Sequence, residues 1–155
     1  MTNMRRLAIS MLLLACAAHG WAWGQSKDQS KDESADELQS RIASARPEDR
    51  PALYIQAARS QLRNADTLYT AGQAEQARAA VAGVVTYSQK ARDAAIQSRK
   101  HMKNVEIAAR KMAERLRDIK RTLNFEDQPP VEQAIQSLED VRTALLKEMF
   151  KKEKK

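Results

Sequence analysis

The amino-acid sequence predicts an all-α protein, and three observations support that fold class. Four Gly and four Pro occur in 155 residues, so few positions interrupt regular backbone structure. Ala, Gln, Arg, Lys and Glu are abundant, and these residues favour helix over sheet. Apolar residues recur at alternating steps of three and four, the spacing that places side chains on one face of a helix. We therefore expect several helices and no sheet.

The first 24 residues have the features of a secretory signal peptide. Arg5 and Arg6 precede an apolar run over residues 7–18. This run is shorter than the roughly 20 apolar residues that cross a bilayer. Small residues, Ala22 among them, suit cleavage before Gln25, which would leave a mature chain of 131 residues. We therefore expect export to a bacterial periplasm or envelope.

An alternative processing site lies at Cys16. The sequence LLAC, residues 13–16, resembles the lipobox of bacterial lipoproteins, and this would leave Cys16 lipidated at the new N-terminus. Cys16 is also the single cysteine of the sequence, so no disulfide can form within one molecule. Stability must therefore come from packing, in a mature chain whose length suits one domain.

The mature chain opens with a polar linker at residues 25–33, which carry charges of both signs and no apolar side chain. A helical domain is expected over residues 34–150, and residues 151–155 form a basic tail. The domain begins with a short helix from Ser34 to Ala45, because Ser34 opens an S-x-x-E capping box.

Two further helices follow in the predicted domain. Proline fits the first turn of a helix and glycine suits its C-terminus, so a helix is expected from Pro51 to Ala71, ahead of Gly72. After it, small and apolar residues keep heptad phase from Ala77 to Leu123, which predicts one long helix with a single seam. The seam consists of Ala77, Val81, Val84, Ser88, Ala91, Ala95, Ser98, Met102, Val105, Ala109, Met112, Leu116, Ile119 and Leu123.

The segment NFEDQPP, residues 124–130, is expected to end the long helix, because residues before proline are pushed out of the α region. Pro130 then begins a last helix, whose apolar stripe runs from Val131 to Met149. A long helix cannot bury its seam alone. We therefore expect two antiparallel helical hairpins that share the long central helix, with coiled-coil-like packing.

This arrangement leaves apolar side chains on the far side of the long helix. Ile96 and Ile107 project away from the seam. Either the long helix bends near residues 98–104 and its halves fold into a compact bundle, or a second chain covers the exposed side.

The first hairpin resembles a tetratricopeptide repeat over residues 58–91. The small, bulky, Gly, Ala and bulky positions of that repeat are occupied by Ala65, Leu68, Gly72, Ala77 and Val81. The sequence departs from the repeat at its early aromatic position, Gln61, and at its closing proline, Gln89. Arrays of such repeats need about three copies, so the resemblance implies a TPR-like hairpin within a helical domain. The whole chain also resembles small exported helical proteins of Gram-negative bacteria.

No catalytic constellation is evident in the sequence. His101 is the one histidine that remains after signal removal, so a multi-histidine metal site cannot form within one mature chain. Ser98 lies one turn from it, but the seam places Ser98 in the interior. The neighbouring carboxylates Glu126 with Asp127, and Glu139 with Asp140, are expected to be solvated. We therefore expect no enzyme activity, no catalytic residue, no cofactor and no metal site.

A basic stripe is the first candidate for binding. Between residues 99 and 121 there are nine Lys or Arg against three acids. Such a stripe suits an anionic surface or is a solvated helix face. The candidate residues are Arg99, Lys100, Lys103, Arg110, Lys111, Arg117, Lys120 and Arg121.

The function expected from these features is a non-enzymatic interaction or scaffold module of the bacterial envelope. It would bind a protein partner, or a second copy of itself, through its helical surfaces, and no small-molecule substrate is indicated. The alternative is a binder of anionic polymer or membrane surface through the basic stripe. Polyanion binding would weaken steeply with ionic strength, whereas apolar helix packing would not.

Overall fold

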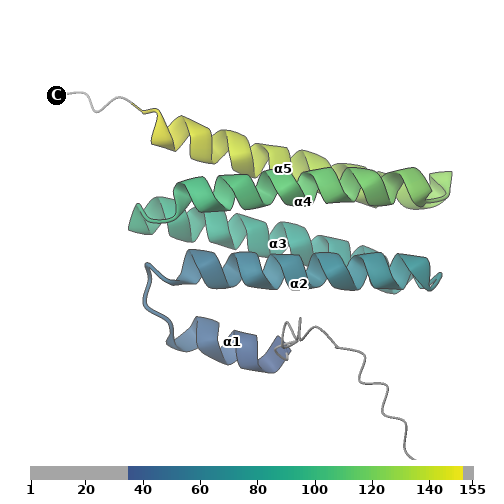
Figure 1. Ribbon diagram of the computed structural model, residues 1–155, viewed down its shortest axis with the longest axis horizontal. Coiled ribbons are helices and arrows are strands. Elements are labelled where there is room, and N and C mark those ends of the chain that lie inside the picture. Colours follow the sequence, from purple (N-terminus) through teal and green to yellow (C-terminus); the bar gives the residue numbers. More distant parts are fainter. Residues whose placement is uncertain (1–34, 152–155) are drawn as a thin grey trace, which may run out of the picture. The chain divides into compact units, whose positions relative to one another are not determined.

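The computed structural model describes residues 35–151. The expected signal peptide, residues 1–24, the linker, residues 25–33, and most of the basic tail lie outside the described residues. Within residues 35–151 the fold is all-α, with five α-helices, one 3-10 turn and no strand. The predicted fold class is confirmed, and Figure 1 shows the helices lying alongside one another.

The first helix, α1, spans Ala35–Ser44 and is a short amphipathic element. Its apolar side chains Leu38 and Ile42 are one turn apart, and both are buried against Ala57. Ala57 belongs to α2, which spans Arg50–Thr70 and begins with Pro51 in its first turn. Gly72 follows with a φ of +73°, a conformation that favours glycine, as the sequence predicted.

The expected single helix from Ala77 to Leu123 is wrong. Helix α3 spans Ala74–Ser98, helix α4 spans Met102–Thr122, and the chain reverses between them. The break uses two left-handed residues, Arg99 with a φ of 54° and His101 with a φ of 63°. The alternative, in which the chain bends near residues 98–104 and folds back, agrees with this observation.

The break is explained by burial, because α3 and α4 are each buried on more than one side. The predicted seam residues of α3 and α4 are buried, apart from the partly exposed Ser98 and Met102. In addition, Ala80, Ala108 and Ala113 are buried although they lie off the seam. A straight helix would leave these second faces in water, so folding back removes more apolar surface from solvent.

The chain leaves α4 through a 3-10 turn, η1, at Phe125–Asp127, and α5 spans Gln128–Met149. Pro129 and Pro130 both stand in the first turn of α5, where their missing N–H groups have no intrahelical partner to lose. The last helix therefore begins at Gln128, two residues before Pro130, where the sequence suggested its start.

Two hairpins, α2 with α3 and α4 with α5, pack on each other (Figure 1). Helix α3 lies against α5, and α2 lies against α4. Ion pairs mark the register, because Asp66 of α2 meets Arg115 of α4 at 2.6 Å and Arg78 of α3 meets Asp127 at 2.8 Å. Each of these pairs joins residues that are 49 positions apart in the sequence. The second hairpin is therefore stacked on the first with α4 parallel to α2 and α5 parallel to α3.

The buried positions of the two hairpins recur at a spacing of 50 residues. The second helix of each hairpin shows this best, and its buried pairs are Val81 with Val131, Val84 with Ala134, Ser88 with Leu138, Ala91 with Val141, and Ala95 with Leu145. The first hairpin carries the smaller residue at most of these positions. Leu116, Leu138 and Leu145 are accordingly among the largest fully buried side chains, and all three lie in the second hairpin.

One glycine, Gly83, lies at the contact between α2 and α3. A Cβ added at Gly83 would stand 3.0 Å from the Cγ of Gln61. Glycine in a helix costs about 1 kcal/mol relative to alanine. Gly83 therefore leaves room for the Gln61 side chain of α2, at some cost in helix propensity.

Candidate functional site

Ser98 and His101, the residues considered for catalysis, lie at the α3–α4 turn. The Ser98 hydroxyl donates to the carbonyl of Ala94 at 2.7 Å and accepts from the amide of Lys100 at 3.3 Å. His101 is exposed and precedes the first residue of α4. The hydrogen bonds of Ser98 are thus both to backbone groups, which is how a serine terminates a helix.

Two of the carboxylates expected to be solvated are held in ion pairs instead. Asp127 accepts from Arg78, and the Asp127 side chain is mostly covered. Glu139 accepts from both Arg117 and Arg142. The sequence could not show the pairs with Arg78 and Arg117, because these arginines come from other helices, whereas Arg142 is one turn after Glu139 on the same helix.

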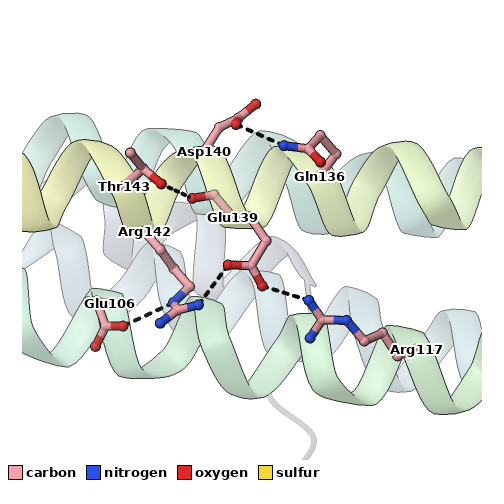
Figure 2. A network of polar contacts seen from close by, with 7 residues as sticks. All are labelled: Glu106, Arg117, Gln136, Glu139, Asp140, Arg142 and Thr143. Atoms are coloured by element: carbon pink, nitrogen blue, oxygen red, sulfur yellow. Dashed lines mark hydrogen bonds and ion pairs between the residues drawn. The ribbon is translucent and has the colours of Figure 1, made fainter.

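Glu139 is the centre of a charged network between α4 and α5, drawn in Figure 2. Its two carboxylate oxygens accept from Arg117 at 2.7 Å and from Arg142 at 2.6 Å. Arg142 also donates to Glu106 on α4 at 3.0 Å. Hydrogen bonding to Arg117, supported by Arg142, lowers the pKa of Glu139, and hydrogen bonding to Glu106 raises the pKa of Arg142. The network therefore fixes α5 on α4 and favours the charged forms of Glu139 and Arg142.

The predicted basic stripe is divided by these ion pairs. Its last three residues face acids, since Arg117 pairs with Glu139, Lys120 with Glu132 and Arg121 with Asp118. The first part is different. Four exposed members of the stripe each form no ion pair with any described residue. They are Lys100, Lys103, Arg110 and Lys111. The cationic part of α4 is therefore its first half, together with the preceding turn that also holds Arg99.

A groove of about 330 Å³ lies between the beginnings of α2 and α4. Its apolar lining comes from Pro51, Ala52, Ile55, Val105 and Ile107, and its polar lining from Arg59, His101 and Asn104. Ile107 was expected to project away from the seam, and in the structure it lines this groove. Neither Arg59 nor His101 takes part in an ion pair within residues 35–151. The groove thus combines an apolar surface with two groups that suit a carboxylate.

Sequence inspection did not identify the groove. Its two sides come from segments about 50 residues apart, and they meet because the second hairpin stacks on the first. One signal was present, namely that Ile107, like Ile96, projects away from the seam of the long predicted helix. That signal indicated a covered or binding surface, although it could not identify the opposite wall.

Three large apolar side chains are exposed in the described part of the chain. Phe125, in η1, is 85% exposed, Phe150, directly after α5, is 78% exposed, and Leu146 is 36% exposed. Phe125 and Phe150 flank α5 at opposite ends. Apolar residues that are adjacent on a surface can mark a contact site, whereas a single exposed one is normal on a protein surface.

Comparison of the chain with protein family models, curated proteins and solved structures gave no match in any of the three. Among residues 35–151, no helix combines the length and the apolar character needed to cross a membrane. In the same residues, no three His, Cys, Asp or Glu side chains gather in a group that could hold a metal ion.

Proposed function

We propose that this protein is a non-enzymatic interaction module of the bacterial envelope that binds a protein partner in the groove between α2 and α4. The observation that carries the proposal is the groove lining, in which Ile55 and Ile107 lie beside Arg59 and His101. Its placement in the envelope rests on the signal-like sequence at the N-terminus.

The groove chemistry favours a partner segment of a particular kind. An apolar side chain would remove the exposed surface of the half-buried Ile107 from water, beside Ile55, which is already buried. A neighbouring Asp, Glu or terminal carboxylate would be met by the guanidinium of Arg59, which can donate two parallel hydrogen bonds. The partner is thus a protein segment that combines an apolar anchor with an acidic group.

Crosslinking in native envelopes, followed by capture of the tagged full chain and mass spectrometry, tests this proposal. Arg59→Glu should abolish capture of the partner, because it puts a carboxylate against the partner's acid. Arg110→Glu makes the same charge change on an exposed part of α4 outside the groove lining and should leave capture intact. Equal capture by both variants, or no protein captured by the unaltered chain, would refute the groove as the binding site.

Binding of an anionic surface through the basic stripe is the second candidate function. It is favoured by the four exposed cations Lys100, Lys103, Arg110 and Lys111. This binding should weaken steeply as salt is raised. Replacing Arg110 and Lys111 by Gln should reduce it, and an unchanged affinity in that double variant would exclude the stripe.

A further inference from the structure

The end of α5 presents two apolar side chains to solvent on one face. Leu146 and Phe150 are four residues apart, so they lie one above the other on the helix surface. The amide of Phe150 donates to the carbonyl of Leu146 at 3.0 Å, which holds Phe150 in continuation of the last turn. Exposures of 36% for Leu146 and 78% for Phe150 leave most of the aromatic ring in water.

Lysines surround this apolar pair. Lys147 is exposed beside it, and Lys151 follows it directly. The last ten residues, LKEMFKKEKK, hold five Lys against two Glu. The one described ion pair of this cluster joins Lys151 to the half-buried Glu148 at 4.0 Å, and the Lys151 side chain is 73% exposed, so the pair neutralises little. An apolar pair flanked by an excess of lysines is the composition of helices that lie at membrane surfaces.

The α3–α4 turn adds cations at the same end of the molecule. Arg142 of α5 is bonded to Glu106 of α4, and the two helices are antiparallel, so the beginning of α4 lies beside the end of α5 (Figure 1). Lys100 and Lys103 are exposed there. Two elements distant in sequence therefore bring positive charge to one end of the bundle.

We propose that this end of the protein docks on an anionic lipid bilayer, with Phe150 and Leu146 entering the boundary between headgroups and acyl chains. Lys147, Lys151 and Lys100 would then lie at the level of the lipid phosphates. The inference extends the second candidate function to α5, and it does not depend on the groove between α2 and α4.

A bilayer fits the chemistry better than other occupants. Leu146 has no aromatic face on which a nucleic-acid base could stack. A second copy would bring two lysine clusters together, and like charges repel. The apolar contact offered by two side chains is also small beside the roughly 1,200–2,000 Å² that a stable protein interface buries. A lipid surface accepts both the apolar pair and the lysines.

Sedimentation of the full chain with phosphatidylcholine vesicles, with and without phosphatidylglycerol, measures this docking. Removing the anionic lipid should weaken binding strongly. Lys147→Gln together with Lys151→Gln should reduce the affinity by about fivefold for each lysine. Phe150→Ser should reduce it by about tenfold. The apolar run at residues 7–18 is present in every variant, so the comparison between variants reports the end of α5.

Matched controls come from the rest of the molecule. Phe125→Ser removes an equally exposed ring at the other end of α5 and should leave vesicle binding unchanged. Arg110→Gln with Lys111→Gln removes the same charge from the middle of α4, so it separates docking by α5 from docking by the stripe. If this pair weakens binding and the α5 lysine pair does not, the stripe is the lipid site and the present inference is wrong.

A position-specific measurement keeps the inference testable if the N-terminal apolar run dominates the affinity. Benzoylphenylalanine placed at position 150 should form lipid adducts on illumination with phosphatidylglycerol vesicles, and the same group at position 125 should not. Equal lipid adducts at both positions, no lipid adduct at position 150, or a crosslink from position 150 to a second copy would each overturn the proposal.

Discussion

Ser88 is a buried hydroxyl without a hydrogen-bond partner, and removing it should stabilise the protein. Its side chain is 0% exposed, and among the described residues its Oγ has no partner. Other helical hydroxyls of this protein donate to the carbonyl four residues earlier, as Thr86 does to Ala82 and Ser98 does to Ala94. The equivalent position in the second hairpin is the apolar Leu138. Ser88 thus carries the cost of a desolvated polar group.

The size of the effect for Ser88→Ala follows from three contributions. Relieving an unsatisfied buried hydroxyl gains about 1 kcal/mol or more. Alanine has a better helix propensity than serine by about 0.5 kcal/mol. The void left by the oxygen, about 10 Å³, costs about 0.2 kcal/mol. The free energy of unfolding should therefore rise by about 1 kcal/mol, which corresponds to an increase in Tm of about 4 °C.

Urea and thermal unfolding followed by circular dichroism measure this change. Ser98→Ala is the matched control, because it deletes a hydroxyl that both donates and accepts, and it should lower the free energy of unfolding by about 1 kcal/mol. The two substitutions remove the same atom with opposite expected signs. A decrease in stability for Ser88→Ala would show that the hydroxyl is satisfied in solution, and the reasoning would fail.

Two further predictions concern charge and backbone conformation. Arg117 and Arg142 lower the pKa of Glu139 in the folded protein. Its ion pairs therefore stabilise the fold at any pH above the ordinary carboxylate pKa, and this stabilisation is lost as the pH falls through the lowered pKa of the folded state. In urea unfolding at about pH 6 and about pH 3, Glu139→Gln should be much less stable than the parent only at the higher pH. An equal difference in the free energy of unfolding at about pH 3 would contradict this. His101→Gly should raise Tm and His101→Val lower it, because φ at position 101 is 63°; a Gly variant that melts earlier would oppose the assignment of strain.

Local sequence signals located most of the secondary structure. Steps of three and four identified the apolar faces, and Gly72 marked the end of α2 with the positive φ expected of it. The break after Ser98 had no such signal, because Arg99 and His101 occupy left-handed positions where glycine is usual. The heptad pattern continues across this break, so it predicts one continuous helix. The predicted helix from Ala77 to Leu123 was wrong for this reason.

The candidate sites, too, could be predicted from the sequence only in part. Exposed lysines of the stripe, such as Lys103, could be identified from their spacing opposite the seam. The ion pairs of Arg117 and Lys120 could not be predicted from the sequence, since their acidic partners Glu139 and Glu132 lie on the next helix. Whether a surface charge is available to a ligand depends on what the fold places opposite it.

The sequence by itself determined that this protein is helical, which faces of its helices are apolar, that Gly72 follows the end of one helix, and that the double proline lies in the first turn of another, because these properties depend on residues within one or two turns. The tertiary structure decided the reversal between α3 and α4, the stacking of two hairpins, the groove at Ile107 and the cationic end near Phe150. These features depend on burial between segments about 50 residues apart. A chain folds back wherever covering its second apolar faces outweighs the local cost of two left-handed residues.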